Sequence, residues 1–529
     1  MGSKTNLGSH LVLQRETKCG FGNSYILGNQ DRSLGKDWSA GGAYTFTIDL
    51  TVAGSLLGVQ TVTLNADTDD IDECVAHIQT QINASLLAGF GEGYKQMVVV
   101  GKDSTDTYIW IGCLEAEAMA LADTAGDPVA THLGIVEATY SKKMVDGTQS
   151  KVTGNYDVDA NIATIDWSAG AMADFKLAIN NRAGYTINLI TNPATEAAMV
   201  DDIQAAIDVH YTNSEFTVSV DGSHFITIAA NGFAFTITDG TATPLDSDMG
   251  ITAGTYEDGN LLVNAPKEGG NVPFEIPHRE QVFLMNDSKR GVGVLEKGHI
   301  YKDGSMSLHL QDLLLLKIAL EGTRNLEIPS FIAHWKDTVD DHESYGVQIH
   351  QYTLNLASSE WAEQVMESMN RHTLEANVNT FTTDADYVSH KHAQTKPRAW
   401  YNIPITIGGF TVDVTDGSLV VINDSDKDNL EFVGKILRAG AILDRQKLEL
   451  ELTYRSSDEA ARRLVNVRTK AITELLIVFT FEFPDGDVVM TLNGMYVDPE
   501  SVNVGDLKDG FVEYTAKYLC GDNFAIVWS

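Results

Sequence analysis

Few residues of this chain stand at spacings that would support catalysis or metal binding. The sequence contains no GxxxxGK[ST] phosphate loop, no HExxH zinc helix and no GxSxG nucleophile elbow. The acidic run Asp67–Glu73 lacks the central glycine and the final glutamate of a calcium-binding loop. Because acidic residues favour the positive end of a helix dipole, this run indicates the start of a helix instead.

Three further candidates are equally unspecific. The glycine run Gly89–Gly93 precedes a strand and lacks the strand–turn–helix context of dinucleotide sites. His390 and His392 could bind a surface metal, but two histidines at this spacing in a polar loop usually do not. His342 and Glu343 fall in an acidic loop with no nucleophile or base at a useful spacing. We therefore expect no enzyme, no metal and no cofactor.

Composition and charge indicate a folded, strongly acidic protein. Hydrophobic residues make up 43% of the 529 residues, which is enough for several cores. The 73 acidic residues outnumber the 37 basic ones and leave a formal charge of −36. Such a surface repels phosphate, which argues against tight nucleic-acid binding. Adaptation to salt or plain solubility explains the same charge equally well.

The cysteines and the apolar runs exclude several other classes. The four cysteines, Cys19, Cys74, Cys113 and Cys520, form no CxxC pair, so we expect reduced, buried thiols. No basic stretch leads into an apolar core at the beginning, which predicts no signal peptide. Runs such as Leu313–Leu316 are too short to span a bilayer, so we expect a protein made in a cytoplasm without a membrane partner.

An internal repeat is the most informative feature. Residues 37–42 read DWSAGG and residues 166–171 read DWSAGA, and an alternating stretch with one apolar face follows each. A short amphipathic helix comes next, then a hairpin, and both copies close alike at Leu133–Tyr140 and Met249–Tyr256. We predict two copies of one small α+β domain with the order hairpin, helix, hairpin, over residues 36–150 and 151–263.

The repeats resemble modules of flagellin, flagellar hook-associated proteins and virion surface proteins. That likeness is one of pattern only. A duplicated spacer without a ligand and a module that binds a host surface or a glycan both remain open.

The remainder, residues 264–529, is predicted to be mostly β. Alternation marks strands at Gly346–Leu356 and Leu448–Tyr454, a hairpin turns at Pro484–Gly486, and Phe511–Tyr518 is a last strand. Two helices are expected, the apolar Gln311–Glu321 and a capped helix from Ser456 through Leu464. This pattern predicts a β-sandwich or half-barrel with one or two flanking helices, which residues 1–35 join as an arm or edge strand.

Three places in the chain resemble the tail tube proteins, or major tail proteins, of long-tailed phages and tailed archaeal viruses. The first is the opening LVLQRETKCGFGNSYILGNQDRSL, with its Glu-Thr-x-x-Gly pattern. The second is FEIPHREQVFL followed by GHIYKDGSMSLHLQDLLLLKIALEG, and the third is PSFIAHWKDTVDDHESYGVQIHQYTLNL. The order of elements carries the resemblance, which covers residues 10–35 and 264–529.

The resemblance implies a structural virion protein whose subunits close into stacked rings around a β-lined channel. Implied partners are further copies of the chain, a tape measure protein, tail terminator and tail tip proteins, and genomic DNA in transit without specific binding. Implied location is the virion tail, assembled in the host cytoplasm. The family ring is commonly hexameric, but residues 264–529 are long enough to be a fused pair of sandwiches, which would favour a trimer.

Two sets of residues are candidates for assembly and transit. The segment Asn23–Arg32 is a candidate arm that orders on assembly, through Asn23, Tyr25, Ile26, Asn29, Asp31 and Arg32. Glu449 and Glu451 lie opposite the apolar face of their strand, so they are candidates for acids that face a channel and repel DNA, although a plain solvated face explains them too.

Two other functions remain open. A flagellin-like or surface-layer filament subunit fits the front repeats, but the sequence predicts neither a signal peptide nor long terminal coiled-coil helices. A carbohydrate-active or peptidase enzyme with binding modules has no motif in its favour.

Overall fold

The structure is a computed structural model of the full chain. It describes residues 10–40, 42–52, 55–91, 94, 97–114, 116–145, 148–168, 173–211, 215–263, 279–282, 294–297, 304–321, 328–336, 341–357, 360–374, 399, 402–424, 445–456, 474–498, 500–508 and 511–529. Strands dominate these residues, so the mainly-β fold class is confirmed.

One sheet of fourteen strands forms the centre of the molecule. Its members are β1 (His10–Arg15), β19 (Asn260–Val263), β22 (Gly304–His309), β23 (Ser330–Lys336), β24 (Asp341–Ala357), β25 (Glu363–Met369), β26 (His372–Leu374), β27 (Ile405–Ile407), β28 (Phe410–Asp424), β29 (Arg445–Ser456), β30 (Leu475–Phe483), β31 (Gly486–Val497), β32 (Asn503–Lys508) and β33 (Phe511–Trp528). The strands expected at Gly346–Leu356, Leu448–Tyr454 and Phe511–Tyr518 lie within β24, β29 and β33, and the expected hairpin is β30–β31.

Six of these strands close into a barrel. They follow one another in the order β28, β27, β30, β31, β33 and β29, and β29 pairs back with β28 over Asp413–Asp424. The sandwich or half-barrel expected from the sequence is therefore a closed barrel that continues through β24 into a second, open part of the sheet. Closure depends on the pairing of β29 with both β28 and β33, which strand periodicity does not reveal.

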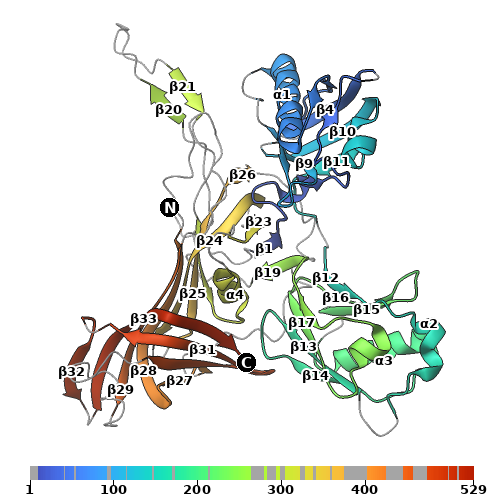
Figure 1. The fold of residues 1–529 in the computed structure, drawn as a ribbon. Helices are drawn as coiled ribbons and strands as arrows, with labels where there is room; N and C mark the ends of the chain where they lie inside the picture. The colour runs from blue at the N-terminus through green and yellow to red at the C-terminus, as the bar shows by residue number, and fades with distance from the viewer. Residues whose placement is uncertain are drawn as a thin grey trace.

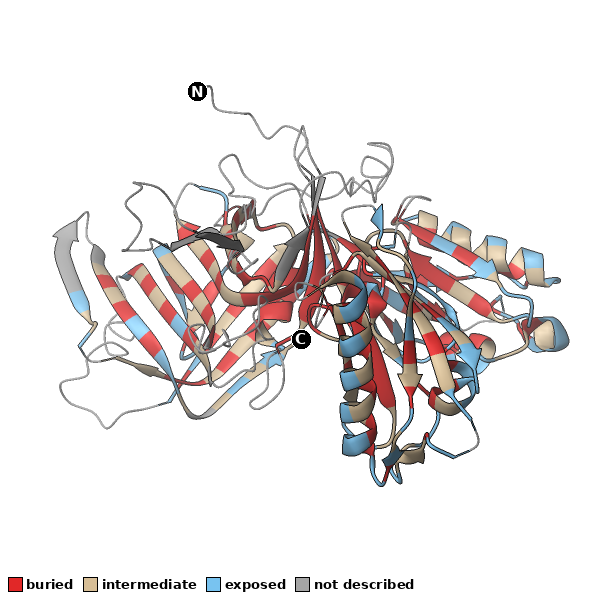
Figure 2. Ribbon diagram, turned by 90° about the horizontal axis from the view of Figure 1, so that it is seen from above, coloured by how far each residue is buried: buried red, intermediate tan, exposed pale blue. Residues whose placement is uncertain are grey.

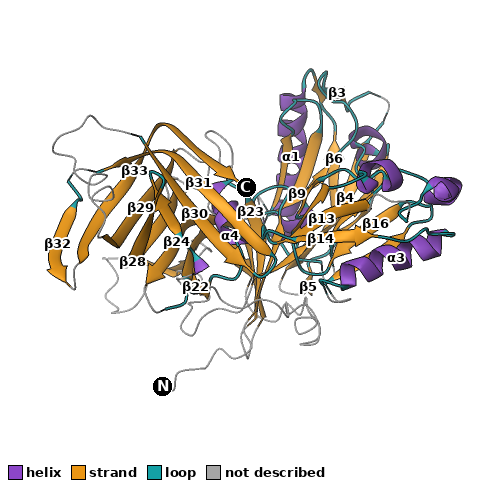
Figure 3. Cartoon of the chain, turned by 90° about the horizontal axis from the view of Figure 1, so that it is seen from below, coloured by secondary structure: helices purple, strands orange, loops and turns teal. Residues whose placement is uncertain are grey.

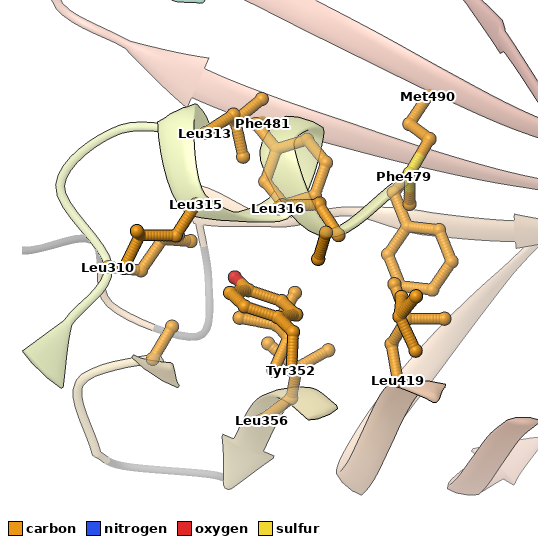
Figure 4. Close-up of a cluster of buried hydrophobic side chains, with 14 of the residues drawn as sticks. Leu310, Leu313, Leu315, Leu316, Tyr352, Leu356, Leu419, Phe479, Phe481 and Met490 are labelled. Carbon is orange, nitrogen blue, oxygen red and sulfur yellow. The ribbon is translucent and has the colours of Figure 1, made fainter. Parts of the chain in front are cut away.

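The helix α4 (Leu314–Leu320) fills the concave side of this sheet. Leu313, Leu315 and Leu316 pack there among the side chains of β24, β28, β30 and β31, including Tyr352 and Phe479 (Figure 4). The sequence predicts a helix that is apolar on most faces and must be covered, and this is confirmed, although the helix begins later than expected. The helix expected from Ser456 through Leu464 lies outside the described residues.

Two α+β units stand on the other side of α4 from the barrel (Figures 1 and 3). The first holds β2 (Ile26–Leu27), β4 (Tyr44–Val52), β5 (Ser55–Leu56), β6 (Gln60–Leu64), α1 (Ile71–Phe90), β8 (Val98–Lys102), β9 (Ile109–Cys113), β10 (Ala118–Ala125) and β11 (Ala138–Ser141). The second holds β12 (Ser150–Thr153), α2 (Val158–Asn161), β13 (Ala173–Ile179), β14 (Tyr185–Leu189), α3 (Glu196–Asp208), β15 (Phe216–Val220), β16 (Ile226–Ala230), β17 (Phe235–Asp239) and β18 (Gly254–Tyr256). Each unit has an apolar core of its own.

The two units share side-chain contacts as well as element order. Gln79 of α1 accepts a hydrogen bond from the Val100 amide at 2.7 Å and donates one to the Val98 carbonyl at 2.9 Å. Gln204 of α3 makes the same pair of bonds to β15, at 2.8 and 3.3 Å. Each helix buries one face, as expected of an amphipathic helix, with Cys74, Ile78 and Ile82 in α1 and Met199, Ile203 and Ile207 in α3. Val75 and Val200, which the sequence places beside them, are half-buried. The repeat is thus a duplication of structure, down to the glutamine that ties each helix to its hairpin.

The first repeat begins earlier than the boundary at residue 36. Its strand β2 pairs with β9 as β12 pairs with β16 in the second repeat. A methyl group at Gly28 would lie 2.1 Å from the Leu133 carbonyl oxygen, and one at Gly154 would lie 1.9 Å from that of Met249. The motif Gly-Asn-x-Asp therefore occupies the same place in both repeats, at residues 28–31 and 154–157. The sequence signal was present but only four residues long.

Candidate functional site

A continuous polar face runs across six strands of the large sheet, in the order β22, β25, β24, β28, β29 and β33. Its side chains alternate with the residues of the core, and all are half-buried or exposed. We call this surface the open face; it comprises Ser305, Ser307, His309, Gln351, Thr353, Asn355, Glu363, Val365, Glu367, Ser418, Val420, Ile422, Lys447, Glu449, Glu451, Lys517 and Leu519. Figure 2 shows the alternation of buried and less buried positions along the barrel strands.

Cross-strand register lines these residues up in rows. One row joins Ser307, Val365, Thr353, Val420 and Glu449 from strand to strand. At a strand spacing of about 4.8 Å, six strands make a surface about 24 Å across from the first strand axis to the last. This width suits a large flat contact or the wall of a channel better than a pocket for a small molecule.

The next row carries three of the six formally charged side chains on the open face. It joins His309, Glu363, Asn355, Ser418, Glu451 and Lys517. Both acids predicted to oppose the apolar face, Glu449 and Glu451, lie on the open face. Lys517 approaches Glu451 at 3.4 Å, so Glu451 is partly neutralised while Glu449 is exposed. Whether either acid faces a channel stays a prediction.

The second repeat is fastened to the rim of the barrel by a buried ion pair. Arg182 donates to Asp485 Oδ1 from Nη2 at 2.7 Å and from Nε at 3.1 Å, and the Gly184 amide donates to Asp485 Oδ2 at 3.0 Å. Both charged side chains are almost fully buried, at 2% and 1% exposure. Asn180 adds a bond to Asp312 at 3.2 Å. Because buried charges are tolerated only when paired, these contacts fix the repeat against the barrel.

The first repeat meets the large sheet around a buried carboxylate. Glu16 accepts hydrogen bonds from the amides of Gly20 at 2.9 Å, Gly22 at 2.9 Å and Gly346 at 3.1 Å. Burial raises the pKa of the Glu16 carboxyl, and the hydrogen bonds from Gly20 and Gly22 oppose that rise. The Glu-Thr-x-x-Gly pattern of the opening residues is therefore a structural turn, in which the glutamate binds the glycine four residues on.

The candidate arm residues lie against the first repeat. Asn23 donates to Gln14 Oε1 at 3.0 Å and to the Lys143 carbonyl at 2.8 Å, and Tyr25 packs on the Trp110 ring. Ile26 pairs with β9, and the Arg32 Nε donates to the His132 carbonyl at 2.6 Å. Asn29 and Asp31 belong to the shared Gly-Asn-x-Asp motif. Apart from the bond from Asn23 to Gln14, the contacts of this segment within the subunit are those of the repeat, so we assign the segment to the repeat. Its role as an arm that orders on assembly stays a prediction.

The residues that the sequence analysis weighed as candidates for metal, nucleotide or catalytic sites either have structural roles or lie outside the described residues. The run Asp67–Glu73 begins a helix, as expected: Asp70 accepts from the Glu73 amide at 2.9 Å, and Glu73 accepts from the Asp69 amide at 2.9 Å. Glu343 does not lie in a loop but in β24, where it is buried and accepts from the Tyr345 hydroxyl at 2.6 Å. Gly91 caps α1, and His390 and His392 are not described.

Two further findings bear on the excluded classes. Within the described ranges, no group of three or more His, Cys, Asp or Glu side chains is placed to hold a metal ion. In the same ranges, no helix has the length and apolar character needed to cross a membrane. Cys19, Cys74 and Cys113 are buried and form no disulfide, whereas Cys520, expected to be buried, is exposed.

Comparison with known proteins leaves the family open. No family model matches the sequence, and no curated protein matches it. Among solved structures, the flagellar cap protein FliD from Helicobacter pylori matches at 13% identity, over 46% of this chain and 59% of that chain, with a TM-score of 0.18. This chain thus covers less than two thirds of that protein, and a likeness at this TM-score carries no argument about fold or function.

Proposed function

We propose that this chain is a structural subunit of the tail tube of a tailed virus. Copies of it close into rings, the rings stack into a hollow conduit for the genome, and the two repeats decorate the outside. The observation that carries the proposal is the open face: a polar surface six strands wide that backs directly onto the main apolar core. A wall of a channel needs this combination, because one side of the sheet must be wet and the other must hold the subunit together.

The same residues suit the passage of DNA without adhesion. Six of the seventeen side chains of the open face carry a hydroxyl or an amide, and four are apolar. Its four glutamates outnumber its two lysines, which leaves a net negative charge that repels phosphate. Implied partners are other copies of the chain, a tape measure protein, and terminator and tip proteins. The hairpin of β20 (Arg279–Val282) and β21 (Val294–Lys297) pairs with no other described strand and stands apart from the sheet (Figure 1). Since an isolated hairpin is marginal in water, it suits contacts between stacked rings.

The repeats belong outside the tube under this proposal. Both lie on the far side of α4 from the barrel, and neither contributes a strand to the open face (Figure 3). Two units of this size would obstruct a surrounding sheath, so we expect a non-contractile tail with decorated walls. Sheath density around the native particle would contradict this expectation.

Reversing charge on the open face is expected to slow genome release. Virions whose tail carries Glu363→Lys together with Glu449→Lys should eject DNA several-fold more slowly, and more so at low salt, because the new lysines attract phosphate. Ejection can be followed with a DNA-binding dye after receptor addition. The matched control is Asp201→Lys, an exposed position on α3 of the second repeat. Normal ejection by the double variant would contradict a channel position for the open face.

Electron microscopy of the purified full chain tests the proposed function itself. Hollow stacked rings are expected. Solid filaments would favour a flagellin-like or surface-layer subunit instead, and particles that stay monodisperse under all assembly conditions would leave no support for a tube.

A further inference from the structure

Two stretches of the large sheet share one order of strands and one set of pairings. The first consists of β1, β19, β22, β23, β24 and β25, and the second of β27, β28, β29, β30, β31 and β33. In both, the first strand pairs with the second and the fourth, the fourth with the fifth, the fifth with the sixth, and the sixth with the third. Five pairings thus correspond one to one, in the same chain order.

A shared irregularity strengthens this correspondence. Between the fourth and fifth strands, each stretch has a bulge in which two residues oppose one. In the first, Tyr345 and Gly346 face Ile332, and in the second, Asn493 and Gly494 face Leu476. The second residue of each bulge is a glycine with positive φ, +64° and +71°. The two stretches thus share a β-bulge at the same place as well as the same strand pairings, which points to a duplication.

The inserted repeats occupy one hairpin of the first stretch. In the second stretch, β27 and β28 are joined by the two glycines Gly408 and Gly409. In the first, the corresponding strands β1 and β19 are separated in the chain by both repeats yet pair side by side. The first stretch also has α4 between its third and fourth strands. The helix that the sequence predicts from Ser456 through Leu464 would stand at the same place in the second.

One pairing differs between the two stretches. In the second, β28 pairs with β29 and closes the barrel. In the first, the corresponding strands β19 and β22 do not pair, and among the described strands β22 is bonded to β25 alone. The Leu310 amide donates to the Ala362 carbonyl at 2.9 Å in the β22–β25 register. Because backbone groups alternate in direction along a strand, those of Ser305 and Ser307 point to the free edge.

The edge of β22 that pairs with no described strand lacks, within the strand itself, the residues that usually protect a sheet edge. Its sequence, GSMSLH, contains no proline, lysine, aspartate or glutamate. Its side chains alternate between the core, with Met306 and Leu308, and the open face. Natural proteins blunt exposed edges with proline and charged residues because an unprotected edge pairs with another chain. The unpaired backbone groups of such an edge can form hydrogen bonds with a strand of another chain in an assembly.

We propose that the large sheet consists of two copies of one six-strand unit and that the edge of β22 is the joint at which a second copy of this chain continues the sheet. The two units are already joined edge to edge within one chain, where β24, the fifth strand of the first unit, pairs with β28, the second strand of the second. The joint at β22 would extend the sheet between chains through the third strand of the first unit instead. The inference rests on the proposed function, since only a closed ring of such head-to-tail contacts removes every free edge.

A change of symmetry follows from this arrangement. Each chain supplies two units to the core but only one pair of outer repeats. The core of a ring therefore shows twice as many equivalent units as the ring has chains, whereas the outer decoration repeats once per chain.

Substitution at the edge of β22 tests the joint. Ser307→Pro removes an outward-facing amide and should leave the subunit folded, because proline is tolerated on an edge where the amide faces solvent. We expect it to abolish ring formation in electron microscopy, while Ser307→Ala, which keeps the backbone donor, assembles like the unaltered chain. Rings formed equally well by Ser307→Pro would overturn the joint without overturning the tube.

Hydrogen exchange supplies a test without substitution. The amides of Ser305 and Ser307 should exchange about a hundredfold more slowly in assembled rings than in the unassembled chain. Equal exchange in the two states would place the joint elsewhere. A ring reconstruction in which core units and chains are equal in number would overturn the duplication, and the absence of any hollow ring would defeat the proposed function together with the inference.

Discussion

Replacing Arg182 by alanine is expected to release the second repeat from the barrel. The substitution leaves Asp485 charged and buried without its partner, and breaking a buried pair in this way costs about 3–5 kcal/mol. The amide of Gly184, which donates to Asp485, should then exchange much faster with solvent. Hydrogen exchange at Gly184 and the free energy of unfolding in urea measure the two effects.

An exposed ion pair on the barrel serves as the matched control. Arg455 and Glu513 approach at 3.3 Å, but their side chains are 51% and 44% exposed. Arg455→Ala should therefore cost less than about 1 kcal/mol. Equal losses at the two sites would mean that the Arg182–Asp485 contact does not fasten the repeat.

Adding a single methyl group at Gly346 is expected to destabilise the junction of the first repeat strongly. A Cβ there would lie 2.6 Å from Arg371 Cβ and 3.2 Å from Cys19 Sγ, and the backbone has a φ of +64°. The left-handed conformation costs a non-glycine residue about 1–2 kcal/mol, and overpacking adds about 1–3 kcal/mol. Gly346→Ala should lower the free energy of unfolding by the sum of these costs.

Gly222→Ala is the control for this substitution. No atom lies within 4 Å of a Cβ placed at Gly222, and its φ is not positive. Its effect should stay within about 0.5 kcal/mol, as for an ordinary surface change. A tolerated Gly346→Ala would show that the bulge can rearrange, and it would weaken the case that Gly346 and Gly494 mark two copies of one unit.

The sequence predicts those parts of the fold that depend on neighbours in the chain. The α4 helix, the alternation of β29 and the two repeats follow from periodicity and from repeated letters such as DWSAG. Within Gly346–Leu356 the alternation lapses near Gln351, and the register of β24 against β25 shifts at that place, between Ile349 and Gln351. Local pattern is informative there because buried and less buried positions alternate along these strands.

Features that depend on distant pairing were missed. Closure of the barrel through β28 and β29 needs a register that no single strand encodes. The buried position of Glu343 could not be read from an acidic stretch, since one of its partners, the Met144 amide, lies 199 residues away in the chain. The duplication within the large sheet left no repeated letters, although the glycines at 346 and 494 were a faint signal.

One reconstruction tests the central claim most directly: a cryo-electron microscopy map of assembled particles at a resolution that traces β22, β25, β24, β28, β29 and β33. We predict that the side of these strands carrying Thr353, Val420 and Glu449 bounds an axial hole, with both appended repeats at the periphery. Finding that side against protein or outer solvent, with nothing hollow at the axis, would contradict the account.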